Sequence, residues 1–98
     1  MKILKFSSAT CMPCKQLAKI IDGLDHEVKS LFEEYTAEND STKFMEFNVR
    51  SVPTLIAVDE SGNELRRSTG MMTEDKLIEF IGGLSLSIEE RNFTRTMK

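Results

Sequence analysis

Two cysteines separated by two residues are the groups in this sequence best suited to chemistry. They lie in the tetrapeptide Cys11-Met12-Pro13-Cys14, and the 98-residue chain contains no other cysteine. A disulfide across so short a loop removes little conformational entropy from the unfolded chain, so it would add little to stability. Two thiols that can close reversibly into a disulfide are instead suited to thiol–disulfide exchange.

The residues after the pair predict a helix, which places the first cysteine at the helix N-terminus. Apolar residues recur at helical spacing beyond Pro13, and proline is tolerated in the first helical turn. The free amides and the dipole at a helix N-terminus stabilise a thiolate on Cys11, and Lys15 adds positive potential. Because the thiolate is the attacking species, we predict that Cys11 attacks and that Cys14, one turn later, resolves the mixed disulfide.

Two other uses of the cysteines stay open on the residues alone. A zinc site needs two further ligands, and the sequence offers only His26 unless a second copy shares the metal. Free cysteines also pack well in a core as small hydrophobic residues. We favour redox chemistry and predict no metal ligand, and we place His26 in a solvated loop.

Composition and charge narrow the class of protein. A chain of 98 residues suffices for one domain with a core, and 40% hydrophobic and 30% charged residues are typical of a soluble globular protein. The net charge of -3 argues against a nucleic-acid partner. No signal peptide is apparent, and the longest aliphatic run, 55–58, is too short to span a membrane. We expect a cytoplasmic protein with no membrane partner.

Strands and helices alternate along the chain and must position the cysteines. Hydrophobic periodicity and turn residues predict strands over 2–6, 31–35, 55–58 and 64–69. The same signals predict helices over 13–22, 41–47 and 74–81, the second capped by Asp40 or Ser41 and the third capped by Thr73, with Leu77, Ile78, Phe80 and Ile81 on its inner face. This order predicts an α/β domain over 1–83, with a mixed sheet and helices on both faces, followed by a tail or short extra helix over 84–98.

Two segments of the sequence resemble the thioredoxin family. The first is Phe6-Ser7-Ser8-Ala9-Thr10-Cys11-Met12-Pro13-Cys14-Lys15, and downstream of it come Val49-Arg50-Ser51-Val52-Pro53-Thr54 and Gly70. The resemblance covers roughly residues 2–82. It implies a thioredoxin fold in a minimal form: a four-stranded mixed sheet with flanking helices, lacking the extra strand and helix that open full thioredoxins.

The resemblance also implies a docking surface for an incoming peptide. In this family the proline of the Val-Pro-Thr motif is cis and lies beside the disulfide, so that Val52 offers its backbone edge to the substrate. The glycine matched by Gly70 leaves space for the substrate backbone, and Met71 or Met72 is suited to an adaptable apolar contact. The predicted substrate-binding residues are Met12, Pro13, Val52, Pro53, Gly70 and Met71.

Some positions depart from the family pattern. Ser7 and Thr10 stand where thioredoxins carry tryptophan, and Met12 replaces the usual glycine. The short layout is nearer to glutaredoxin in size. The glutaredoxin features that hold glutathione are not matched, since the cysteine motif lacks a tyrosine and Gly70-Met71-Met72-Thr73 replaces the glycine pair and its following acids.

The charge at Lys5 is the sharpest departure. Six residues before the first cysteine, thioredoxins carry a buried aspartate that helps move the proton of the second cysteine, and a lysine on the next strand pairs with it. Aligning back from Pro53 puts Glu34 at the position of that lysine. We predict that Lys5 and Glu34 form the pair with exchanged charges and carry the proton of Cys14, the alternative being that Lys5 points to solvent. The acids Glu33, Glu34 and Glu38 are assigned mostly to a solvated face.

The implied function is thiol–disulfide oxidoreduction: reduction of protein disulfides through the Cys11–Cys14 dithiol, with no bound cofactor. Electrons would come indirectly from NADPH through a thioredoxin reductase, or from glutathione, and ribonucleotide reductase is one candidate substrate. We expect a monomer. Two alternatives stay open, a glutathione-dependent glutaredoxin-like enzyme and a thioredoxin-fold subunit that binds a partner through the surface around the cysteines.

Overall fold

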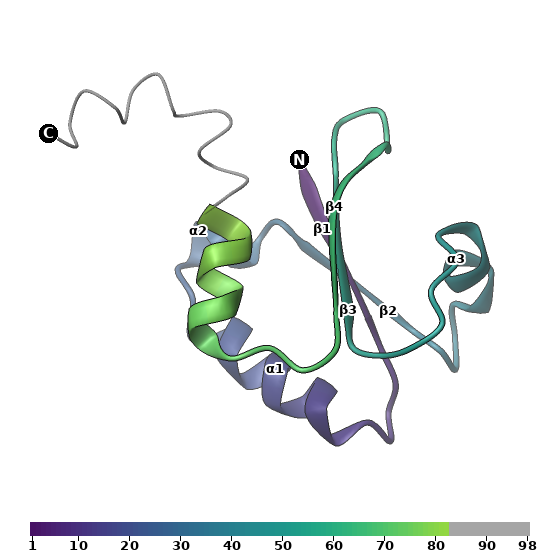
Figure 1. The fold of residues 1–98 in the computed structure, drawn as a ribbon, viewed down its shortest axis with the longest axis horizontal. Coiled ribbons are helices and arrows are strands. Elements are labelled where there is room, and N and C mark those ends of the chain that lie inside the picture. The colour runs from purple at the N-terminus through teal and green to yellow at the C-terminus, as the bar shows by residue number, and fades with distance from the viewer. Residues whose placement is uncertain (83–98) are drawn as a thin grey trace, which may run out of the picture.

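Four strands form one mixed sheet in the computed structural model, which describes residues 1–82 (Figure 1). In the order β2-β1-β3-β4 across the sheet, the strands are β2 (Phe32–Thr36), β1 (Lys2–Ser7), β3 (Thr54–Val58) and β4 (Glu64–Thr69). Strand β1 runs parallel to β2 and antiparallel to β3, and β3 and β4 form an antiparallel hairpin. The predicted α/β class and mixed four-stranded sheet are confirmed.

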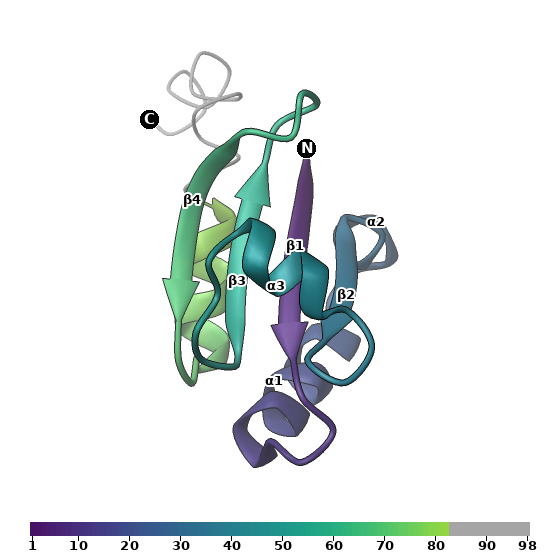
Figure 2. The same ribbon diagram turned by 90° about the vertical axis from the view of Figure 1, so that its right-hand side faces the viewer.

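Helices cover both faces of the sheet. Figure 2 shows α3 (Ser41–Glu46) in front of the strands, with α1 (Met12–Asp22) and the last helix, residues 74–82, behind them. On the face of the sheet that α1 and the last helix cover lies one hydrophobic cluster. Its main members are Ile3, Leu17, Ile21, Leu55, Ala57, Met72, Leu77 and Phe80. The α3 face is a second cluster, in which the partly buried Tyr35, Phe44 and Phe47 pack against Leu4, Phe6, Ile56 and Val58. The strands β1 and β3 contribute to both clusters, which explains why they are buried along most of their length.

The two faces of β1 differ in chemistry. Successive side chains of a strand point to opposite faces, so Leu4 and Phe6 point towards α3 whereas Ile3, Lys5 and Ser7 point towards α1. All five side chains are buried. Buried polar groups require hydrogen-bond partners. The hydrogen-bond partners of Lys5 and Ser7 lie at the functional site.

Two local predictions in the first half need correction. A short helix, α2 (His26–Lys29), replaces the predicted loop around His26, whose side chain is nevertheless exposed. Four residues are too few to show hydrophobic periodicity, so the sequence carries little signal for this helix. Asp40 occupies the N-cap position of α3, but its carboxylate accepts a 2.9 Å hydrogen bond from the Thr36 amide instead of capping the helix.

The last helix is confirmed, with one side chain wrongly placed. Thr73 caps it by accepting a 3.2 Å hydrogen bond from the Lys76 amide. Leu77 and Phe80 are buried, but Ile78 is 50% exposed because neighbouring helical positions do not share a face. The predicted tail or extra helix over 84–98 lies outside the described residues. The helices described within residues 1–82 include none that could span a lipid bilayer.

Candidate active site

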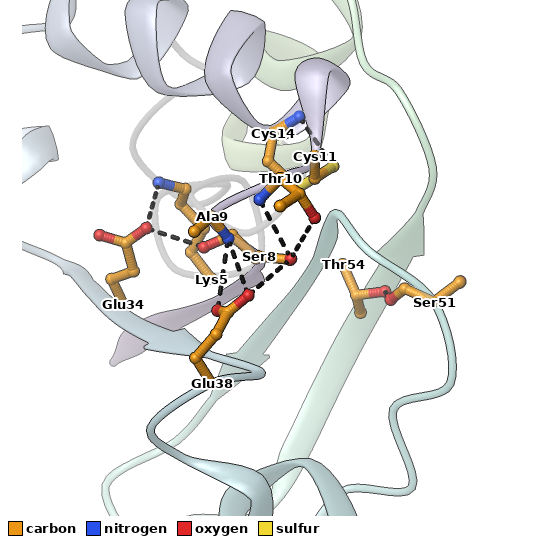
Figure 3. The surroundings of a disulfide bond; sticks show 11 residues. Lys5, Ser8, Ala9, Thr10, Cys11, Cys14, Glu34, Glu38, Ser51 and Thr54 are labelled. Carbon is orange, nitrogen blue, oxygen red and sulfur yellow. Dashed lines mark hydrogen bonds and ion pairs between the residues drawn. A yellow bond between two sulfur atoms is a disulfide. The ribbon is translucent and has the colours of Figure 1, made fainter.

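The two cysteines form a disulfide at the N-terminus of α1 (Figure 3). Cys11 is the N-cap residue, and its Sγ accepts a 3.1 Å hydrogen bond from the backbone N–H of Cys14. Pro13 lies in the first turn, where a missing amide donor costs nothing. Cys11 is partly exposed, whereas Cys14 is only 3% exposed. An incoming disulfide therefore meets Cys11 first.

The strand register brings three loops to the same edge of the sheet. Phe6, near the end of β1, pairs with Thr54 at the start of β3, and Thr54 in turn pairs with Thr69 at the end of β4. The loop that leads from β1 to Cys11 therefore lies at the same end of the sheet as the residues before β3 and after β4. The Val52–Pro53 peptide bond is cis, as the family resemblance implies.

Gly70 is tied directly to the cis proline. Its backbone N–H donates a 2.8 Å hydrogen bond to the Pro53 carbonyl oxygen, which joins the loop after β4 to the loop before β3. Gly70 has a φ of 95°, a conformation that residues with a side chain rarely adopt. A glycine is thus required at this position by the backbone, and an added Cβ would have open space around it.

We expect Gly70→Ala to lower the free energy of unfolding by about 1–2 kcal/mol, the cost of left-handed backbone for an L-residue. Gly23→Ala is the matched control, because Gly23 has an ordinary φ of -86° at the end of α1. Both substitutions reduce the entropy of the unfolded chain, so their difference isolates the backbone conformation. Urea denaturation of both variants measures it, and equal stabilities would contradict this reading of Gly70.

Apolar side chains are exposed among the predicted substrate-binding residues. Met12, between the cysteines, is 61% exposed, and Met71, which follows Gly70, is 48% exposed. Met72 is only 3% exposed and belongs to the core, so Met71 is the methionine available to a ligand. Pro53 is buried and Val52 is partly buried.

Lys5 and Glu34 form an ion pair between β1 and β2. The two residues are directly opposite in the parallel register, and Lys5 Nζ lies 3.0 Å from Glu34 Oε2. Ser7 Oγ donates a 2.8 Å hydrogen bond to the same carboxylate oxygen. Lys5 is 8% exposed, so it does not point to solvent, whereas the Glu34 side chain is 54% exposed.

The pKa of Glu34 is lowered from its ordinary value. The hydrogen bond from Ser7 is the largest cause, and the hydrogen bond and charge of Lys5 act in the same direction, against the opposing effect of burial. Glu34 is therefore a carboxylate throughout the neutral range. Its contribution to stability is present at neutral pH and is lost only as the pH falls through the lowered pKa.

Glu38 has a role that the sequence reasoning missed. Its carboxylate accepts hydrogen bonds from Ser8 Oγ at 3.0 Å and from the Ala9 amide at 3.2 Å (Figure 3). Glu38 is exposed, as predicted, and it also anchors the loop that leads from β1 to Cys11. Glu33, assigned to the same face, instead bonds Lys2 and Tyr35. The contacts of Glu38 with Ser8 and Ala9, and of Glu33 with Lys2, join residues about thirty positions apart, so no local pattern signals them.

Residues 1–82 hold no group of three or more histidine, cysteine, aspartate or glutamate side chains placed to bind a metal ion. The chemically distinctive features of this end of the sheet are the helix-terminal cysteine pair and the cis Val52–Pro53 peptide bond.

A sheet of this topology with a cysteine pair at the start of α1 defines a thioredoxin-fold protein with a redox-active disulfide. Among known proteins, the family model described as thioredoxin matches residues 1–83. Thioredoxin from Chlamydia caviae is 31% identical over 80 residues, which is 81% of this chain and 78% of that protein. Thioredoxin from Haemophilus influenzae is 28% identical over 81 residues, with 81% and 75% covered. The chain belongs to the thioredoxin family.

Solved structures agree on the fold. Thioredoxin 1 from Thermosipho africanus superimposes with a TM-score of 0.74 at 23% identity, covering 92% of this chain and 99% of that one. Thioredoxin from Fasciola hepatica gives a TM-score of 0.72 at 25% identity, covering 82% and 76%. Membership of this family makes the chain a thiol–disulfide oxidoreductase whose redox group is a protein disulfide, here Cys11–Cys14.

Proposed function

We propose that this protein is a protein-disulfide reductase in which Cys11 is the attacking thiolate and Cys14 the resolving thiol. The observation that carries the proposal is the asymmetry of the pair: the N-cap sulfur of Cys11 is accessible and bonded by a helix amide, and Cys14 is buried one turn behind it. An anion at the helix N-terminus is favoured by the free amides and the dipole.

The reaction consists of two exchange steps. The Cys11 thiolate attacks one sulfur of a substrate disulfide, which breaks that bond, forms a mixed disulfide and releases the other substrate sulfur as a thiolate that takes a proton. The Cys14 thiol then loses its proton and attacks Cys11 Sγ. This step forms the Cys11–Cys14 disulfide and releases the second substrate thiol, so the substrate gains two electrons and the cysteine pair loses two. An external dithiol or reductase must then reduce the pair.

The substrate docks at the edge where the three loops meet. We assign the exposed apolar contacts to Met12, Pro13 and Met71. The backbone contact is assigned to Val52, where the family resemblance implies that an extended peptide pairs as an added strand. Gly70 and Pro53, hydrogen-bonded to one another, hold that edge in place. Flexible methionine side chains suit a surface that accepts several substrates.

The same proposal assigns a role to the ion pair. Lys5 and Glu34 govern the loss of the Cys14 proton, since the ion pair and Cys14 line one hollow.

The proposal also includes the location and the redox partners. A cytoplasmic location favours the reducing direction. NADPH would be the distant electron source through a thioredoxin reductase, and ribonucleotide reductase is one candidate substrate.

Insulin reduction tests the proposal against both donors. We expect the full chain to reduce insulin when NADPH and thioredoxin reductase are supplied, and to do so more slowly with glutathione and glutathione reductase. The reverse preference would favour a glutathione-dependent, glutaredoxin-like enzyme. Activity with neither donor, in protein whose cysteines are shown to be reduced at the start, would contradict the proposal and favour a binding subunit.

A further inference from the structure

Lys5 is a buried cation on the face of the sheet that carries the cysteines. It lies on β1 between Ile3 and Ser7, which point to the same face, and its side chain is 10% exposed. Burying an ammonium group is costly unless it is paired and hydrogen-bonded. Its partner, Glu34, is itself half exposed at the outer strand of the sheet. The ion pair thus has its positive end inside the protein and its negative end at the surface.

A hollow of about 200 Å³ connects this pair to the resolving cysteine. Strands β1 and β2, the loop after β1, and the first turns of α1 line it, and it is open to solvent. The titratable and charged groups that line it are Lys5 from β1, Glu34 from β2, and Cys14 and Lys15 from α1. Two cations and one carboxylate therefore line the hollow that Cys14 also lines, and the balance of charge along it is positive.

Ser7 controls where the negative charge lies. Its hydroxyl and the Lys5 ammonium bind the same atom, Glu34 Oε2, at 2.8 and 3.0 Å. A carboxylate on a half-exposed side chain has freedom to turn into solvent, and a second donor on the same oxygen opposes that motion. Ser7 is buried at 4% exposure, so its hydroxyl is a fixed point on the rigid strand.

We propose that Lys5 acts on Cys14 as a fixed positive charge and that Ser7 is the positioning residue that sets how far Glu34 neutralises that charge. The inference rests on the proposed role of Cys14 as the resolving thiol. The Cys14 proton then leaves through the hollow to water or to the departing substrate thiolate, and neither member of the ion pair stores it.

The charge state of Glu34 indicates that the ion pair acts on Cys14 through its charge and does not carry the Cys14 proton. The lowered pKa of Glu34 keeps it ionised at neutral pH, so it is a weak base and holds no proton to return. An ammonium group near a thiol stabilises the thiolate by Coulomb attraction, an effect that grows where water is excluded. Neutralising the carboxylate leaves Lys5 less compensated and strengthens this effect.

Titration of the Cys14 thiol tests which charges act on it. In a Cys11→Ser chain, where Cys14 is the only thiol, the ultraviolet absorbance of the thiolate is followed against pH. We expect Lys5→Met to raise the ionisation midpoint by about one pH unit, a typical effect of one neighbouring charge. We expect Glu34→Gln to lower the midpoint. Ser7→Ala is expected to lower it by a smaller amount, and Ser7→Thr, which keeps the hydroxyl, to restore it.

Several outcomes would overturn the inference. A higher midpoint in Glu34→Gln would contradict the role given to Glu34 of neutralising Lys5, and an unchanged midpoint in Lys5→Met would show that the ammonium does not act on Cys14. An unchanged midpoint in Ser7→Ala would remove its positioning role. Lys5→Arg retains the positive charge and is expected to keep the Cys14 midpoint of the parent chain. This variant is the comparison to use if Lys5→Met fails to fold. The readout needs no substrate, so failure of insulin reduction is distinguished from failure of this inference.

Discussion

A Cys11→Ser variant is expected to reduce insulin no faster than the same reaction without the protein. A hydroxyl at the N-cap of α1 keeps the hydrogen-bonding ability of that position but is not ionised near neutral pH, so it cannot attack a disulfide. Cys11 is the accessible member of the pair, and Cys14, at 3% exposure, cannot reach a protein disulfide in its place. The assay is insulin reduction with NADPH and thioredoxin reductase, with urea denaturation confirming that the variant is folded.

Cys14→Ser is the matched variant, because it removes the other thiol and leaves the attacking one. We expect it to form a mixed disulfide with the substrate through Cys11 and to stop there, since no thiol remains to resolve it. Gel electrophoresis without reductant detects the covalent complex. A Cys11→Ser chain that formed the complex, or that retained full biological function, would contradict the assigned roles, and retained function would favour a binding subunit.

Phe6→Ala is expected to cost about 3–5 kcal/mol of unfolding free energy, the range for truncation of a buried phenylalanine. Phe6 is fully buried, and its ring lies 5.6 Å from that of Tyr35, 5.0 Å from Phe44 and 6.0 Å from Phe47 between centroids. The alanine variant loses contacts with all three rings and leaves a cavity beneath α3. Domains of this size are stable by only about 5–15 kcal/mol, so the loss is a large share of the total.

Leu65→Ala is the control for this prediction. Leu65 lies on β4 and is 53% exposed, so its truncation is expected to change stability by less than about 0.5 kcal/mol. Both variants are measured by urea denaturation with the disulfide intact, so that the redox state is the same. A loss below about 1 kcal/mol for Phe6→Ala would mean that the aromatic cluster on the α3 face contributes far less than its burial indicates.

Local features of the sequence suffice to predict the parts of the site that depend on neighbouring residues. The helix after Cys11 follows from proline in the first turn and from apolar residues at helical spacing, so the pair is correctly placed at the N-terminus of α1. The buried strand β3 follows from its continuous apolar run. These signals act over a few residues, within one element, and need no knowledge of the fold.

The electrostatic surroundings of Cys14 depend on tertiary structure. Lys5 and Glu34 are 29 residues apart, and the family resemblance suggested their pairing, but the parallel register of β1 and β2 decides that it forms. No feature of the sequence predicts that Ser7 and Lys5 bind the same oxygen of Glu34, or that Glu38 anchors the loop before Cys11.

The cysteine pair is thus a local property of this sequence, since its spacing and the helix that follows place both thiols. The charges that share a hollow with the second thiol, in contrast, are set by the tertiary fold. The side-chain oxygens and nitrogens that set that environment come from separate strands, and hydrogen bonds act over about 3 Å. A register shift of one residue would turn Lys5 or Glu34 to the opposite face of the sheet, so the chemistry of Cys14 depends on how β1 and β2 pair.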